Sequence, residues 1–124
     1  MVTHPRAVVL VDEPDASDTW ERELARAGLT LTRTTFRAAA DGSALPRSPV
    51  VIVVSPGVVE HLPNEMESLR RLSERGELVV IVPANRLFLA AYLVGAGICV
   101  ARAGVDSPAT IARGISERGA GRRR

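Results

Sequence analysis

The chain has 124 residues, 46% of them hydrophobic and only 3% aromatic, so we expect one domain over residues 1–119 with an aliphatic core. No window holds the roughly eighteen uninterrupted apolar residues of a membrane span, and the acidic N-terminal segment does not suit a signal peptide, which together predict a cytoplasmic protein. The single cysteine, Cys99, excludes an internal disulfide and a cysteine-rich metal cluster, and we expect it to be an inert core residue.

The net charge of +2 comes from the end of the chain. All sixteen basic residues are Arg, and three of them are Arg122, Arg123 and Arg124. Without these three, thirteen Arg face fourteen acidic residues, so the body is nearly neutral and no direct contact with nucleic acid is expected. Residues 120–124 are interpreted as a solvated tail or the start of a linker.

The first third of the chain predicts two strands, each followed by a helical segment. Residues 7–11 are entirely apolar, as expected of a strand covered on both faces, and Asp15 can cap a helix that Gly28 ends. Residues 29–34 alternate between apolar and polar side chains, which is typical of a half-exposed strand near a sheet edge. The segment 36–45 is only weakly helical, because a turn sequence interrupts it.

Residues 48–56, SPVVIVVSP, contain the strand expected at the centre of the sheet. Residues 50–54 are β-branched throughout, and they lead directly to Ser55. In an open α/β sheet, ligands and chemistry lie at this carboxyl end of the strands. Farther along, Pro63 can open a helix, and residues 78–82 form another apolar strand.

The last third predicts two helices and a short strand. Asn85 can cap a helix over residues 86–94, and residues 98–101 form the strand. Asp106 or Ser107 then caps a final helix. Because parallel neighbouring strands need helical crossovers, this alternation predicts an α/β fold with a doubly wound, five-stranded parallel sheet and helices on both faces.

This layout resembles the receiver domain of two-component response regulators. The resemblance covers essentially the whole chain and depends on three stretches: VVLVDEPDA at 8–16, PVVIVVSPG at 49–57 and AAYLVGAGICVARAG at 90–104. It implies a flavodoxin-like topology with the strand order 2-1-3-4-5.

The resemblance also implies a degenerate site at the strand ends. In the family, an acidic pair after the first strand binds magnesium, and Asp12 and Glu13 occupy these positions. Ser55 stands where the family has the aspartate that accepts the phosphoryl group, Pro83 where it has a hydroxyl residue, and Arg102 where it has a lysine. Only the acidic pair and the cationic position match.

These replacements predict that the chain does not carry out phosphoryl transfer. The hydroxyl of Ser55 is neutral and has no base nearby in the sequence, and Pro83 has neither a hydroxyl nor an N–H group. The site has one carboxylate fewer than the family's magnesium site, so Asp12 and Glu13 are expected to bind magnesium weakly or not at all. No other cofactor, no catalytic residue and no enzymatic activity are expected.

Each of these residues also has a purely structural interpretation. Asp12 and Glu13 can simply close a strand, and Ser55 can be a small turn residue. Arg102 can form a structural ion pair with the two carboxylates. His61, isolated in the sequence, is expected at the surface.

We therefore expect a pseudo-receiver, which is a phosphorylation-independent signalling or transcription-regulatory module that contacts a partner protein or its own output domain. The alternative is a regulatory domain that binds a small molecule, with an anion or metabolite held between Arg102 and the strand-end loops.

The helix at residues 87–94 reads LFLAAYLV and carries no charged residue over more than two turns. Only part of its circumference can face the sheet, and an uncovered apolar face marks an interface. In receivers the corresponding helix commonly contributes to the dimer surface. The sequence therefore predicts a homodimer or partner contact through exposed members of this set: Leu87, Phe88, Ala91, Tyr92 and Val94.

Overall fold

The computed structural model describes residues 7–13, 19–26, 28–42 and 50–119. Within them, the strands are β1 (Ala7–Val11), β2 (Leu31–Thr34), β3 (Val50–Val54), β4 (Glu77–Val82) and β5 (Cys99–Arg102). The helices are α1 (Thr19–Arg26), α2 (Phe36–Ala40), α3 (Pro56–Glu60), α4 (Glu65–Ser73), α5 (Leu87–Gly95) and α6 (Pro108–Gly119). The predicted cap at Asp15 and the tail at 120–124 lie outside the described residues.

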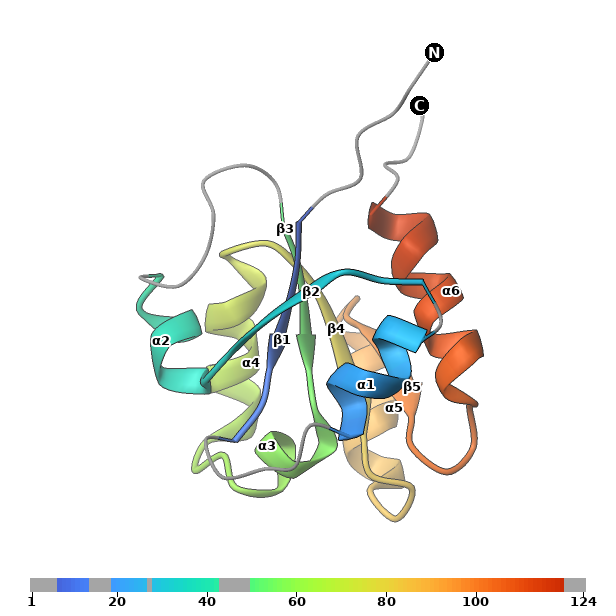
Figure 1. Cartoon of the computed structure of the whole chain (residues 1–124). Helices are drawn as coiled ribbons and strands as arrows, with labels where there is room; N and C mark the ends of the chain where they lie inside the picture. The colour runs from blue at the N-terminus through green and yellow to red at the C-terminus, as the bar shows by residue number, and fades with distance from the viewer. Residues whose placement is uncertain (1–6, 14–18, 27, 43–49, 120–124) are drawn as a thin grey trace.

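All five strands are parallel, and they pair in the order β2-β1-β3-β4-β5. This arrangement confirms the predicted flavodoxin-like α/β fold. The carboxyl ends of the strands meet at one edge of the sheet, which is the lower edge in Figure 1, where α3 also lies. The strands thus bring residues from distant parts of the sequence to a common edge.

Helices cover both faces of the sheet (Figure 1). The strand residues alternate between the two faces, as the two-residue period of a strand requires. One face packs against α2, α3, α4 and α5 through residues such as Val9, Val11, Ile52, Val54, Val80 and Val82. The other face packs against α1 and α6 through Val8, Leu10, Val51, Val53, Val79 and Ile81. Because both sides are covered, the central strands contain no polar alternation.

Three details differ from the sequence prediction. Helix α4 begins at Glu65, with Asn64 as its N-cap, and not at Pro63. The short helix α3 was not expected, and it begins directly after β3 with Ser55 as its N-cap. Asn85 does not cap α5, because Arg86 holds the N-cap position without a side-chain cap bond. A turn from Pro83, closed by the Arg86 N–H donating to the Pro83 carbonyl at 3.0 Å, delays the start of the helix. The guanidinium of Arg86 pairs with Glu65 instead.

At the last helix, α6, the predicted cap at Ser107 is confirmed, because the Ser107 hydroxyl accepts a hydrogen bond from the Thr110 N–H at 3.1 Å.

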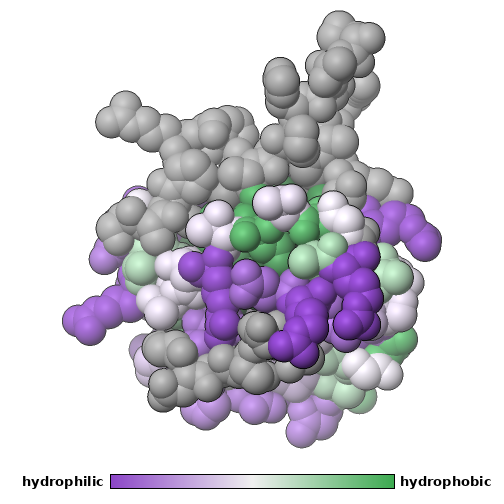
Figure 2. All heavy atoms as spheres, in the orientation of Figure 1, coloured by the Kyte–Doolittle hydropathy of each residue, from purple (hydrophilic) through white to green (hydrophobic). Residues whose placement is uncertain are grey.

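Hydrophilic side chains gather across the middle of the face that carries β2 and α1 (Figure 2). Among the described residues, no helix has both the length and the apolar character that crossing a membrane requires.

Candidate functional site

The ends of three neighbouring strands place Asp12, Thr35 and Ser55 side by side. Val11 is in register with Thr34 on one side and with Val54 on the other. The ladder continues one residue farther, because the Asp12 N–H donates to Thr34 O at 2.8 Å and the Ser55 N–H donates to Val11 O at 3.0 Å. The predicted site residues of β1 and β3 are therefore neighbours.

Ser55 is buried, with 1% of its surface exposed. Its hydroxyl donates a hydrogen bond to Asp12 Oδ1 at 2.8 Å and accepts one from the Val58 N–H at 3.4 Å. The second bond is the N-cap of α3, which satisfies a backbone donor that has no partner within the helix. The hydroxyl is thus enclosed and engaged on both sides, and no substrate can reach it in this conformation.

Arg33, on the edge strand β2, is the cation next to the acidic pair. Its Nη2 lies 3.7 Å from Asp12 Oδ2 and donates to the main-chain carbonyl of Glu13 at 3.3 Å. Within the described part of the chain, Arg102 forms no ion pair with Asp12 or Glu13, so the interpretation of Arg102 as their structural partner was wrong. The strand order explains the difference, since β2 lies directly beside β1 whereas β5 is three strands away.

His61 pairs with Glu13 at the surface. Its Nδ1 lies 2.5 Å from Glu13 Oε2 and 2.8 Å from the Gly57 carbonyl oxygen, so Nδ1 must carry a proton to donate to either. The hydrogen bond to the Gly57 carbonyl and the negative charge of Glu13 raise the pKa of His61 above its ordinary 6.5. His61 is exposed, as expected, but it is not isolated.

Pro83 and Arg102 lie at the ends of β4 and β5, on the other side of Ser55. Pro83 is buried. Arg102 Nη2 donates to the carbonyl of Ala84 at 3.3 Å, and its main-chain N–H donates to Asp106 Oδ2 at 3.0 Å. Its Nε is buried with no hydrogen-bond partner. The structure therefore unites Asp12, Glu13 and Ser55 and holds Arg102 apart from them.

The acidic pair does not fit a magnesium site. Asp12 Oδ1 already accepts hydrogen bonds from the Ser55 hydroxyl and from the Glu13 N–H, and Glu13 pairs with His61. No group of three or more His, Cys, Asp or Glu residues in the described part of the chain could hold a metal ion. A hard cation such as Mg²⁺ prefers several oxygen anions, and here a cation of the chain, Arg33, already lies 3.7 Å from Asp12 Oδ2.

A cavity of about 320 Å³ opens beside the acidic pair. Its wall is mainly apolar and comes from α2, α3 and the segment after α3, namely Phe36, Val58, Leu62 and Pro63. Asp12, Glu13, Arg37 and His61 supply charged groups to the same cavity. This cavity lies at the strand ends, where the fold places ligand sites.

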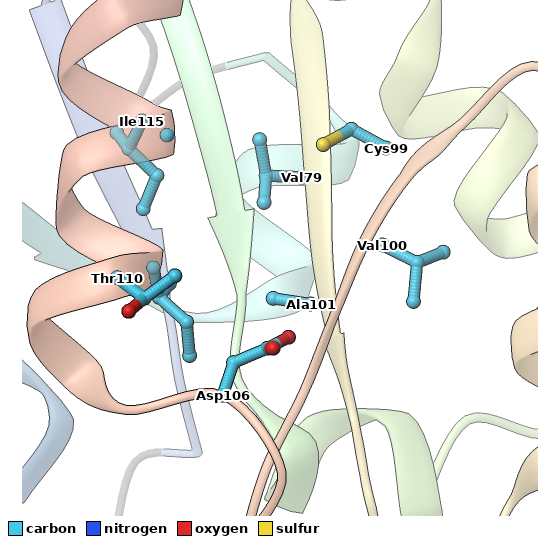
Figure 3. A pocket seen from close by; sticks show the side chains of 9 residues that line it. Val79, Cys99, Val100, Ala101, Asp106, Thr110 and Ile115 are labelled. Atoms are coloured by element: carbon cyan, nitrogen blue, oxygen red, sulfur yellow. The ribbon is translucent and has the colours of Figure 1, made fainter.

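A smaller cavity of about 170 Å³ lies between β5 and α6. Figure 3 shows Val79, Cys99 and Ala101 on the side of this cavity that faces Thr110 and Ile115 of α6, whereas Val100 points away. Cys99 is half-buried and packs against the core of that face. Its surroundings are apolar, in agreement with a structural role.

Helix α5 has one buried side and one exposed apolar side. Leu89, Ala90 and Leu93 are buried against the sheet. The exposed fraction is 93% for Phe88 and between 57% and 62% for Leu87, Tyr92 and Val94, and Ala91 is exposed as well. The exposed apolar residues of α5 are thus the five that the sequence selected. We call Leu87, Phe88, Ala91, Tyr92 and Val94 the α5 patch.

Sequence reasoning missed Arg33 and His61. Arg33 stands in the alternating strand at 31–34, and only the pairing of β2 with β1 brings it to Asp12. His61 reaches Glu13 because α3 turns the chain back after Ser55. The pair Ser55-Pro56, a cap residue followed by proline, is the signal that could have revealed this helix.

Comparison of the chain with family models, with curated proteins and with solved structures gives no match.

Proposed function

We propose that this chain is an atypical, receiver-like regulatory module that works through protein contacts of α5 and without phosphoryl transfer. The observation that carries the proposal is the exposure of the five apolar side chains of the α5 patch. A soluble domain rarely exposes a contiguous apolar surface of this kind unless a partner covers it.

The proposed contact is a homodimer. The α5 patch contains no charged side chain, so it offers nothing that selects a partner of opposite charge, whereas it suits the same surface of a second copy across a twofold axis. The five side chains present on the order of 500 Å² per copy, and a twofold contact would bury about 1,000 Å², near the lower limit for specific interfaces. Phe88 and Tyr92, the largest members, supply the anchors.

Two features support the absence of a phosphoryl-transfer step. The hydroxyl of Ser55 is enclosed and hydrogen-bonded to Asp12 and to the Val58 N–H. Pro83 offers no donor for an oxygen of the transferring group, although such donors supply much of the catalysis in phosphoryl transfer. Regulation would then depend on assembly rather than on covalent modification.

The alternative of an anion at Arg102 is less well supported. Arg102 Nη2 is already donating to the Ala84 carbonyl, and Nε is buried. The cavity at the strand ends lies instead beside Asp12 and Glu13, which favours a ligand with a hydrogen-bond donor over an anion.

Sedimentation velocity tests the dimer with a matched pair of variants. Ala91→Arg places a charge in the α5 patch, and Ala25→Arg places the same charge at an exposed position of α1. We expect the wild type and Ala25→Arg to dimerise with rising concentration and Ala91→Arg to stay a folded monomer, because an unpaired buried charge opposes association. A wild type that stays monomeric at high concentration, or equal dimerisation of both variants, would refute the proposal.

A further inference from the structure

The cavity beside Asp12 has the size of a small-molecule site. Its volume of about 320 Å³ lies within the range of ligand pockets. It corresponds to roughly ten water molecules, so it accommodates a ligand of about ten non-hydrogen atoms. Phe36, Val58, Leu62 and Pro63 give it an apolar wall that suits a branched or aromatic hydrocarbon group.

Asp12 provides an open acceptor at this cavity. The side chain is only 5% exposed, and Oδ1 accepts both of its hydrogen bonds, from Ser55 and from the Glu13 N–H. No described residue donates a hydrogen bond to Oδ2, whose nearest cation, Arg33 Nη2, is 3.7 Å away and thus beyond hydrogen-bonding distance. A carboxylate that lines a cavity and has one oxygen without a hydrogen bond favours a ligand that brings a donor, and an ammonium group is the strongest such donor.

Arg37 provides an open cation at the same cavity. It belongs to α2 and is exposed, and within the described part of the chain its guanidinium forms neither an ion pair nor a hydrogen bond. A guanidinium binds a carboxylate through two parallel hydrogen bonds. A ligand with a carboxylate next to its ammonium group would therefore satisfy both Asp12 and Arg37.

We propose that this cavity binds a free apolar α-amino acid. The ammonium group donates to Asp12 Oδ2, the carboxylate accepts from Arg37, and the side chain packs against the apolar wall. Asp12 and Glu13 repel a simple anion. A simple amine offers no carboxylate to Arg37, and its positive charge would lie close to the positive charge of Arg37. The zwitterion is the one of these three ligand classes that complements both charges.

Isothermal titration calorimetry with four compounds tests the ligand class. L-Phenylalanine is the expected ligand, 2-phenylethylamine lacks the carboxylate, 3-phenylpropionate lacks the ammonium group, and glycine lacks the apolar group. We expect L-phenylalanine to bind and each of the other three to bind about tenfold more weakly or worse, because each loses one charge-assisted contact or the apolar contact. No binding of L-phenylalanine, or equal binding of the amine or of the acid, would overturn the proposal.

A matched pair of variants locates the site. Arg37→Ala removes the carboxylate partner, and Arg113→Ala removes an exposed arginine of α6 on the other face of the sheet. We expect only Arg37→Ala to weaken L-phenylalanine binding, by about tenfold or more, while thermal denaturation shows both variants folded. Unchanged affinity in Arg37→Ala would refute the assignment. The monomeric Ala91→Arg variant should still bind L-phenylalanine, so this test is independent of the dimer.

Discussion

The hydroxyl group of Ser55 forms two contacts that hold the strand ends together. It joins β3 to Asp12 at the end of β1, and it caps α3. We expect Ser55→Ala to lower the free energy of unfolding by about 1–2 kcal/mol, because it removes a cap and leaves a buried carboxylate oxygen with one hydrogen bond fewer. Urea denaturation measures this loss.

Ser73→Ala is the control, because the Ser73 hydroxyl also donates a local hydrogen bond, to the Arg70 carbonyl at 2.6 Å, but this bond is exposed to solvent. Its stability should change by less than about 0.5 kcal/mol. Equal losses in the two variants would contradict the role of Ser55 as a buried link.

His61 should titrate above its ordinary pKa. The Gly57 carbonyl and then Glu13 raise this pKa, so Glu13→Gln should lower it, and NMR titration of the ring protons, assigned with His61→Asn, measures the change. Because the pKa in the folded state is raised, the stabilising contribution of His61 is fully present below pH 6.5 and is lost as the pH rises through the folded value. An unchanged titration in Glu13→Gln would show that Glu13 does not contribute.

At the scale of residues, the sequence predicted the strand-end cluster better than its partners. Asp12 and Glu13 follow an unmistakable apolar strand, so their place at the sheet edge could be predicted. Arg33 could not be linked to Asp12, because a one-residue change in strand register would turn it to the other face. Likewise, the pairing of His61 with Glu13 depends on the short helix α3, which the sequence pattern did not reveal.

The buried side of helix α5 contributes to the stability of the monomer, whereas its exposed side is proposed to form the dimer contact. Leu93 is fully buried, so we expect Leu93→Ala to cost about 2–5 kcal/mol of stability through lost packing and a cavity. Phe88 is 93% exposed, so Phe88→Ala should change the stability of the monomer by less than about 0.5 kcal/mol. Both variants are compared in the Ala91→Arg background, where a dimer cannot add concentration-dependent stability. A large loss in Phe88→Ala there would mean that its ring packs within the chain.

Among the elements, strands were predicted more reliably than short helices. The apolar runs in β1, β3 and β4 indicate strands covered on both faces, and the structure agrees. The sequence PGVVE of α3 is too short for a helical period to be visible, and only its cap residue marks it. Asn85 was assigned as a cap from its residue type alone, but the turn at Pro83 takes up the residues before α5.

The whole molecule should resist phosphorylation. We expect no added phosphoryl group by intact-mass spectrometry after incubation with acetyl phosphate, because Ser55 is enclosed and Pro83 supplies no donor. Ser55→Asp should also stay largely unmodified, since it restores the acceptor without restoring the donor. A stable phosphoryl adduct on the wild type would contradict the proposed mode of regulation.

The overall topology was accessible from the sequence because local and global patterns agree. Each strand is separated from the next by a segment that contains at least one helix, and parallel neighbouring strands require crossovers of this kind. The occupant of the strand-end cavity was not accessible, because its wall joins Phe36 of α2 with Leu62 after α3, which no pattern in the sequence connects.

The packing of α6 determines when the chain can finish folding. Ile111, Ala112 and Ile115 of this last helix pack in the same cluster as Val8 and Leu10 of the first strand, and α6 also contacts α1. One face of the sheet therefore stays incomplete until residues 108–119 have left the ribosome. Until then, α1 alone covers this side of the apolar strands β1, β3 and β4, and such partly exposed apolar surface is vulnerable to aggregation.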